Sequence, residues 1–282
     1  MDIIDIHTHV ISTDTRRYPL APHGGKQSEW SQTRPVTAEG LIAQMDKAGV
    51  AKSAVVHAST AYGFDNSYLA DSVAKYPDRF TGVFSIDMLA ADARGELDRW
   101  MRAGLTGMRL FTTGSTAPGQ ADWLADARTF PVWERAEEAG LAVCLQMTPQ
   151  GVPDLLKLLA RFRRVPIVLD HLARPVLTDG PPYAAAKWLF DLAPHSNLFL
   201  KLTTRTVEQA SEGNSKAEEF FPRLVAAFGA NRIAWGSNFP AHAGPLERLT
   251  DEAKHALACL SDAERASIFA GTARRLYPIL NS

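Results

Sequence analysis

Eight short apolar runs alternate with longer segments of helical spacing along the whole chain, without a break in composition that would mark a domain linker. The runs cover residues 3–9, 53–59, 80–87, 106–111, 141–147, 166–171, 198–204 and 232–238. Most are continuously apolar rather than strictly alternating, which is typical of parallel strands covered on both faces. The pattern therefore predicts a succession of βα units.

The segments between the runs carry signals for the ends of helices. Residues 37–50 open on Thr37, a residue type that caps helix N-termini, and close near Gly49, a residue type that ends helices. Two later segments end on Gly104 and Gly140 in the same way. Eight such units in 282 residues match a single-domain (β/α)8 TIM barrel. An open doubly wound sheet is the alternative, but the first run is not followed by the G-x-G-x-x-G motif of that fold.

Two segments depart from this pattern. Residues 11–36 are rich in Gly, Pro and polar residues and carry Tyr18 and Trp30. A loop of this length in a compact domain is usually functional, so we expect an active-site loop over the carboxyl ends of the strands. After the eighth run, helices around residues 246–258 and 261–274 are predicted to pack outside or beneath the barrel.

Charge and cysteine content narrow the class of protein. Thirty basic and 31 acidic residues give a net charge of −1, and no run of five like charges occurs, which argues against nucleic-acid and membrane partners. Cys144 and Cys259 cannot form a disulfide framework. No leader pattern and no long apolar segment is present, so a cytoplasmic protein is predicted. A homo-oligomer is compatible with this composition.

Polar side chains gather at the predicted strand ends, where the reactive groups of such barrels project. They are His7, His9, His57, Ser59, Asp87, Arg109, Gln146, His171, Lys201 and Asn238. Because side chains alternate along a strand, His7 and His9 share one face and can meet one metal ion or one substrate. Two hydrogen-bonded core histidines are the structural alternative, but a third strand-end histidine, His171, favours a functional site.

Five motifs occur in order along the chain: "DIHTHV", "GLTGMRLF", "VLDHLARP", "LFLKLT" and "RIAWGSNFP". With them the chain resembles the amidohydrolase superfamily, in particular the amidohydrolase-related branch that includes 2-pyrone-4,6-dicarboxylate lactonases and sugar-lactone hydrolases. The resemblance runs from Asp5 to the terminal "GTARRLYP". Its motifs are specific for fold and superfamily and much less specific for substrate.

The resemblance implies that His7, His9 and His171 bind one divalent metal, as in many members, or bind substrate directly, as in metal-free lactonases. Imidazole suits zinc, which would polarise a carbonyl or lower the pKa of a bound water. The strand-eight motif normally ends in a catalytic aspartate, whereas this chain has Asn238. A carboxamide is a poor base and a poor metal ligand, so a metal-independent reaction is a second interpretation.

Three explanations of Asn238 remain open: an inactivating Asp→Asn change, a natural subgroup with another base, or loss of hydrolysis. The intact residues around it favour the natural subgroup. His171 or His9 is then the first candidate base, because histidine titrates near neutral pH. Asp87 is a carboxylate alternative.

Two further aspartates are interpreted as structural. Asp65 precedes a helix-like stretch and is more typical of a helix cap than of a base. Asp170 directly precedes His171, so strand alternation predicts that it points away from the lumen.

Arg109, Arg174 and Lys201 predict an anionic small-molecule substrate. Arginine matches a carboxylate with two hydrogen bonds, and the resemblance implies arginines at Arg109 and Arg174 that bind a carboxylated lactone. A solvent-exposed salt bridge is the alternative for Arg174. Lys201 lies in an apolar strand and needs a partner, such as a substrate oxygen, an acidic residue or a metal-bridging group. We assign it the stabilisation of developing oxyanion charge.

The remaining polar residues are weaker candidates. Gln146, His57 and Ser59 are expected to bind substrate or to have internal partners. His23, Arg205 and His242 are expected near the mouth at most. The sequence thus predicts a hydrolase that opens a carboxylated lactone or related cyclic ester or amide in catabolism. The alternatives are a non-oxidative decarboxylase of an aromatic or muconate-type acid and a catalytically silent binding protein.

Overall fold

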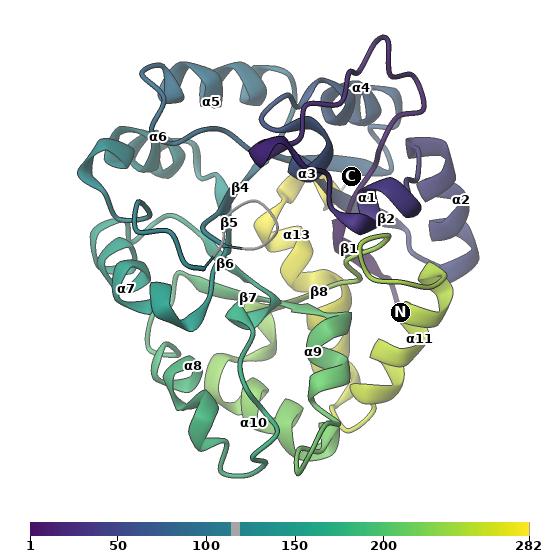
Figure 1. The fold of residues 1–282 in the computed structure, drawn as a ribbon. Coiled ribbons are helices and arrows are strands. Elements are labelled where there is room, and N and C mark those ends of the chain that lie inside the picture. The colour runs from purple at the N-terminus through teal and green to yellow at the C-terminus, as the bar shows by residue number, and fades with distance from the viewer. Residues whose placement is uncertain (114–118, 282) are drawn as a thin grey trace.

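A computed structural model of the chain describes residues 1–113 and 119–281. In this part of the chain, eight parallel strands follow one another in sequence order around a central barrel, and helices surround them (Figure 1). The strands are β1 (Ile4–Thr8), β2 (Lys52–Val56), β3 (Phe80–Phe84), β4 (Gly107–Phe111), β5 (Ala142–Gln146), β6 (Ile167–Asp170), β7 (Leu198–Thr203) and β8 (Ile233–Gly236). Each coincides with a predicted run, although β2 begins one residue before its run, so the predicted (β/α)8 barrel is confirmed.

The first and last strands meet and close the barrel. The His9 amide donates to the Phe239 carbonyl at 2.8 Å. The fully buried carboxylate of Asp5 accepts hydrogen bonds from the amides of His7 and Ser237, both at 2.9 Å. Asp5 therefore ties β1 to the end of β8 through its side chain, and an open sheet is excluded.

Helices and short turns connect the strands. The α-helices are α1 (Glu29–Thr33), α2 (Ala38–Ala48), α3 (Ser59–Tyr62), α4 (Ser67–Lys75), α5 (Ala93–Arg102), α6 (Phe130–Ala139), α7 (Val152–Arg161), α8 (Lys187–Asp191), α9 (Thr204–Gln209), α10 (Ala217–Phe228), α11 (Leu246–Ala256), α12 (Asp262–Ala266) and α13 (Thr272–Leu276). Shorter turns are η1 (His23–Gly25), η2 (Ala127–Thr129), η3 (Pro149–Gly151), η4 (His171–Ala173), η5 (Ala184–Ala186), η6 (Ala230–Arg232), the π-turn η7 (Ser267–Gly271) and η8 (Pro278–Asn281).

The predicted helix signals are confirmed at several ends. The Thr37 side chain accepts from the Gly40 amide at 3.1 Å and so caps α2. Gly49 and Gly140 follow α2 and α6 with φ of 68° and 62°, a left-handed conformation that glycine adopts without steric cost. The helix expected over residues 261–274 is divided into α12 and α13 by the π-turn η7.

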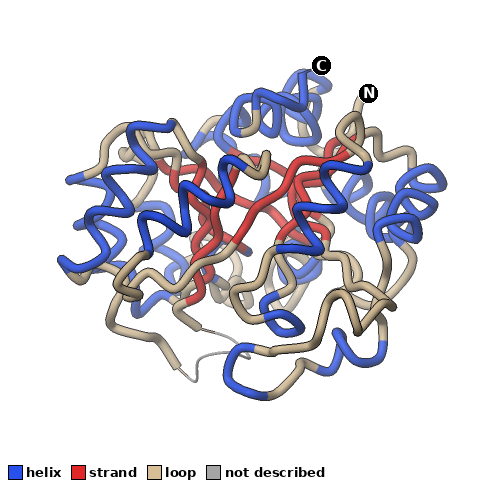
Figure 2. The backbone as a smooth tube through the Cα atoms, turned by 90° about the horizontal axis from the view of Figure 1, so that it is seen from above, coloured by secondary structure: helices blue, strands red, loops and turns tan. Residues whose placement is uncertain are grey.

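Two apolar layers lie on the two sides of the sheet. The outer layer joins the strands to the surrounding helices, whereas the inner layer fills the lumen with alternate strand residues such as Ile4, Ile6 and Cys144. Tyr277, which follows α13, belongs to this inner layer and closes the barrel from below. Its ring approaches Gly107 so closely that a Cβ there would lie 2.8 Å from it. Figure 2 shows both termini at this end and long loops at the opposite end.

The long loop, residues 11–36, is partly helical because it contains η1 and α1. Trp30 packs its ring against His9, with 5.0 Å between ring centroids. Tyr18 lies instead in a small apolar cluster beside the loop, and its hydroxyl donates to Asp71 at 2.5 Å. Only Trp30 of the two aromatic residues therefore reaches the histidines.

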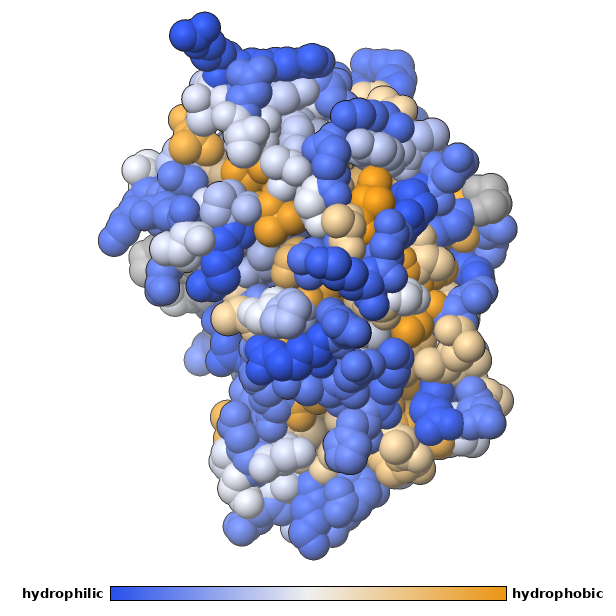
Figure 3. Space-filling view, turned by 90° about the vertical axis from the view of Figure 1, so that its right-hand side faces the viewer, coloured by the Kyte–Doolittle hydropathy of each residue, from blue (hydrophilic) through white to orange (hydrophobic). Residues whose placement is uncertain are grey.

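The surface facing α2 and α11 is mostly hydrophilic, with hydrophobic atoms in small groups between the charged side chains (Figure 3). Within the described residues, every helix is too short or too polar to span a bilayer.

Candidate active site

A cavity of about 250 Å³ lies at the carboxyl ends of the strands. It is lined by His9, Ser28, Trp30, His57, Ala58, Ser59, Thr60, Arg109, Phe111, Gln146, His171, Arg174, Arg205, Asn238 and Ala241. Of the strand-end residues predicted for the site, His7, Asp87 and Lys201 lie outside this lining and the others belong to it. A larger hollow of about 700 Å³, beside Met1 and Asp2, lies away from the histidines and is lined mainly by the terminal helices.

An irregularity in β1 brings its two histidines to the site. Asp5 and Thr8 pair with residues only two apart on β2, so one extra residue is accommodated between them. The rings of His7 and His9 lie 5.1 Å apart. Gly236 on β8 is required beside His7, because a Cβ there would lie 2.6 Å from the His7 Cβ. The two rings are thus neighbours, although only His9 lines the cavity.

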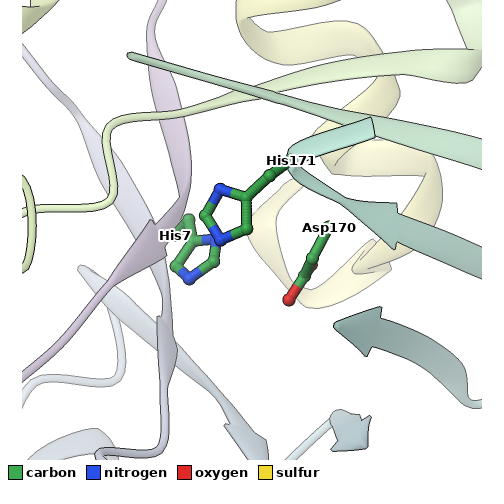
Figure 4. A group of neighbouring side chains, drawn as sticks. All are labelled: His7, Asp170 and His171. Atoms are coloured by element: carbon green, nitrogen blue, oxygen red, sulfur yellow. The ribbon is translucent and has the colours of Figure 1, made fainter. Parts of the chain in front are cut away.

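A left-handed turn follows β6 and brings His171 to the same place. Four successive residues, His171 to Arg174, have φ between 53° and 59°. This conformation costs non-glycine residues roughly 1–2 kcal/mol each, and such strain is typical of functional sites. The rings of His7 and His171 lie 4.9 Å apart (Figure 4).

The same turn explains why the prediction for Asp170 was wrong. Asp170 is the last residue of β6 and pairs in register with Lys201, so both side chains enter the lumen. Strand alternation ends at Asp170 because His171 already belongs to the left-handed turn. Two consecutive residues can therefore face the lumen, as Figure 4 shows.

Asp170 is the centre of a buried ion network. Its Oδ2 accepts from Arg109 Nε at 2.6 Å, and its Oδ1 lies 2.8 Å from Lys201 Nζ. Burial alone raises the pKa of Asp170, but Lys201 and Arg109 outweigh it and hold the pKa below its usual range. Lys201 is fully buried and also contacts Cys144 Sγ at 3.3 Å. The partner that Lys201 needs is thus an acidic residue, and its ammonium lies beneath the cavity rather than in its wall.

Arg109 is fixed by its neighbours. Its Nη2 donates to Gln146 Oε1 at 2.9 Å, and its guanidinium lies 4.4 Å from the centre of the Phe111 ring. With Nε bound to Asp170, this guanidinium has a single orientation at the cavity wall. Much of its hydrogen-bonding capacity, and that of Gln146, is therefore used within the protein.

The buried histidines are neutral. Burial lowers the pKa of His9 and His171 to about 3 and that of His57 to about 4. His9 Nδ1 lies 2.9 Å from the Val56 carbonyl, and His57 Nε2 lies 2.8 Å from the Gly63 carbonyl. Because a carbonyl only accepts, these nitrogens carry the protons. The lone pairs of His9 and His57 are then on His9 Nε2 and His57 Nδ1.

Arg174 and Arg205 give the cavity an excess of positive charge. Neither guanidinium has an ion-pair partner in the described residues, and no carboxylate of this part of the chain lines the cavity. Burial, together with Arg205 and Arg109, lowers the pKa of Arg174, as expected where cations face one another. The salt bridge considered for Arg174 is thus absent from the part of the chain that the structure describes.

The model of the family described as amidohydrolase matches residues 4–279 of this chain. The chain belongs to the amidohydrolase family. Its resemblance to that superfamily, inferred from five motifs, is thereby confirmed.

Known relatives of this amidohydrolase include enzymes named for lactones. The L-fucono-1,5-lactonase of Burkholderia ambifaria is 30% identical over 212 residues, which cover 73% of this chain and 69% of the relative. The 4-sulfomuconolactone hydrolase of Rhizobium radiobacter is 24% identical over 252 residues, covering 88% and 79%. A zinc-bound amidohydrolase of Burkholderia multivorans has the same fold, with a TM-score of 0.77, 20% identity and 99% of each chain covered.

His7, His171 and Asp170 form a potential metal site in this amidohydrolase. One ligand atom from each lies within 4.8 Å of the others. Both ring nitrogens of His7 are buried without a hydrogen-bond partner, which marks them as donors in need of a ligand. Burial also lowers the pKa of His7 and keeps the ring neutral, as metal binding requires. Although Arg109 and Lys201 already neutralise Asp170, the two imidazoles fit a divalent ion such as zinc.

Four of the weaker candidates, His57, Ser59, Gln146 and Arg205, line the central cavity, whereas Asp65, Asp87, His23 and His242 lie outside its lining. The Asp65 carboxylate accepts from the Ser67 amide at 2.9 Å, one residue ahead of Asn66, which is the N-cap of α4. Asp87 is exposed and accepts from the Leu89 amide at 3.0 Å, so the structure does not place it as a base. The His23 ring lies 4.9 Å from the Phe64 ring at a tilt of 60°, and His242 pairs with Glu208 at 3.1 Å.

We expect His57→Gln to make the fold less sensitive to acid. The pKa of His57 is about 4 in the folded protein and near 6.5 when unfolded, so the unfolded chain binds the proton more readily. The contribution of neutral His57 to the free energy of unfolding is therefore fully present above about pH 6.5 and is lost as the pH falls toward 4. Between pH 7 and pH 5 this one histidine accounts for about 2 kcal/mol of the loss.

Urea unfolding at pH 7 and pH 5 measures this difference. His255→Gln is the matched control, because His255 is exposed. An equal loss of stability in the wild type and in His57→Gln would contradict the prediction.

Proposed function

We propose that this amidohydrolase hydrolyses a lactone that bears a carboxylate group. The observation that carries the proposal is the cavity wall: three guanidiniums and three neutral histidines, without a carboxylate in the described residues. Such a wall favours an anion, and arginine matches a carboxylate with two hydrogen bonds. The two relatives named for lactones support ring opening as the reaction.

In this proposal, some cavity residues bind the substrate and others transfer protons. Arg174 and Arg205 hold the substrate carboxylate, and the lactone carbonyl lies beside His171. His9 Nε2 accepts a proton as water adds to the carbonyl carbon, and the ring oxygen leaves with a proton to give a hydroxy acid. A bound carboxylate offsets the positive charge of Arg109, which otherwise lowers the pKa of His9, so the substrate strengthens its own base. A divalent ion held by His7 and His171 would supply Lewis-acid polarisation of the carbonyl.

Purified protein incubated with carboxylated lactones and neutral sugar lactones tests the proposal. We expect acid release without gas, fastest with the carboxylated lactones. Carbon dioxide release from aromatic acids would establish a decarboxylase instead, and ligand-induced stabilisation without turnover would establish a binding protein.

We expect Arg174→Gln to lower kcat/KM for a carboxylated lactone about 10–100-fold. A hydrogen bond to a charged group contributes about 1.5–3 kcal/mol, and about 1.4 kcal/mol corresponds to a factor of ten. A neutral lactone of the same ring size should lose less than threefold. Arg163→Gln, at an exposed arginine, is the control. Equal losses on both lactones would show that Arg174 does not bind the carboxylate.

A further inference from the structure

A second cavity of about 220 Å³ adjoins the first. Its lining consists of His23, Ser59, Phe64, Ile86, Asp87, Met88, Leu89, Phe111 and Trp123. Ser59 and Phe111 line both cavities, so the two cavities adjoin at these residues. We call this second cavity the side compartment.

The side compartment differs in chemistry from the arginine-lined cavity. Phe64, Phe111 and Trp123 present aromatic rings, and Ile86, Met88 and Leu89 add apolar side chains, beside the polar His23, Ser59 and Asp87. Its only described carboxylate is the exposed Asp87, and no arginine or lysine of the described residues lines it. A second carboxylate on the substrate would meet no arginine or lysine among these residues and would be repelled by Asp87. An uncharged apolar group would displace water from the apolar side chains of this lining.

The volumes of the two cavities also favour a single site that includes both. Small-molecule sites usually have about 300–1,000 Å³, which exceeds the 250 Å³ of the arginine-lined cavity. With the 220 Å³ of the side compartment, the combined site falls within that range.

The boundary between the cavities is fixed by the ion network. Arg109 lies over the Phe111 ring at 4.4 Å and is itself held by Asp170. These contacts keep the Phe111 ring in place where the two cavities adjoin. Ser59, the other residue shared by both cavities, is buried at the start of α3.

We propose that the side compartment binds an uncharged alkyl or aryl substituent of the substrate. The substrate is then a monocarboxylated lactone with an apolar side group, its carboxylate at Arg174 and Arg205 and its side group between Phe64 and Trp123. This inference rests on the proposed function for the ring-opening step, although the binding of the apolar group can be tested without turnover.

Leu89→Trp tests the side compartment by filling it. Leu89 is 38% exposed at its edge, and Leu156 on α7, also 38% exposed, provides the matched control Leu156→Trp. For two carboxylated lactones that differ only in a phenyl substituent, we expect the wild type to favour the phenyl compound at least tenfold in kcat/KM. Leu89→Trp should reduce that preference at least tenfold, and Leu156→Trp should retain it. A preference that is absent from the wild type, or equal in all three proteins, would overturn the proposal.

A binding measurement separates this proposal from the proposed function. We expect 3-phenylpropionate to raise the melting temperature of the wild type more than propionate does, and Leu89→Trp to abolish the difference. If that holds but no lactone is opened, the hydrolase function fails and the side compartment stands. If lactones are opened but 3-phenylpropionate binds no better than propionate, the side compartment fails and the hydrolase function stands.

Discussion

Asp170→Asn is expected to lower the free energy of unfolding by about 3–5 kcal/mol, the usual cost of breaking a buried ion pair by removing one partner. The asparagine leaves the fully buried ammonium of Lys201 without a counter-charge, and Arg109 loses the carboxylate that orients it. The same change should reduce kcat/KM for a carboxylated lactone at least a hundredfold, because a misplaced guanidinium next to the substrate is costly.

Urea unfolding at pH 7 measures the loss of stability. Asp191→Asn, in the exposed pair of Lys187 and Asp191, is the matched control and should lose only a few tenths of a kcal/mol. In the double variant Asp170→Asn/Lys201→Met, most of the stability should return, because no unpaired ammonium remains. A single variant as stable as the wild type would contradict the assignment.

The pH dependence of the wild type provides a second check. The pKa of Asp170 is lowered on folding from 3.8, so its contribution is present above about pH 4 and is lost as the pH falls below that value. Asp170→Asn should therefore show a weaker loss of stability in this range than the wild type does.

The fold could be predicted because each strand and helix is marked by residues within its own short segment of the sequence. Each strand is a short apolar run, and Thr37 and Gly49 mark the ends of a helix by their own backbone preferences. The strand-end histidines could be found for the same reason, since the carboxyl ends of all barrel strands meet at one mouth.

The ion network could not be predicted, because it depends on register between strands. Asp170 and Lys201 become neighbours only when β6 and β7 pair, and the left-handed turn after Asp170 ends the alternation on which the prediction relied. One signal was available: an isolated lysine in an apolar strand requires a buried acid, and the adjacent strand offered Asp170. Arg109 and Asp170 belong to two different motifs, so neither motif alone predicts that these two side chains form an ion pair.

Asn238 occupies a position that an aspartate would tolerate equally well. Its φ of 62° is left-handed, a conformation in which asparagine and aspartate are both enriched. We therefore expect Asn238→Asp to fold with little change in stability, so that its effect reports the chemistry of the cavity. A carboxylate there would pair with the guanidiniums of Arg174 or Arg205 and compete with the substrate carboxylate.

For Asn238→Asp we accordingly expect kcat/KM on a carboxylated lactone to fall at least tenfold, mainly through a higher KM, with a smaller loss on a neutral lactone. Asn231→Asp adds the same charge at an exposed site and should change neither value. Elemental analysis of both proteins belongs to the same experiment, because a carboxylate is a better metal ligand than a carboxamide. If Asn238→Asp gains both metal and activity, Asn238 is an inactivating change and His9 is not the base. If neither protein contains metal, the potential metal site of His7 and His171 is not used as one.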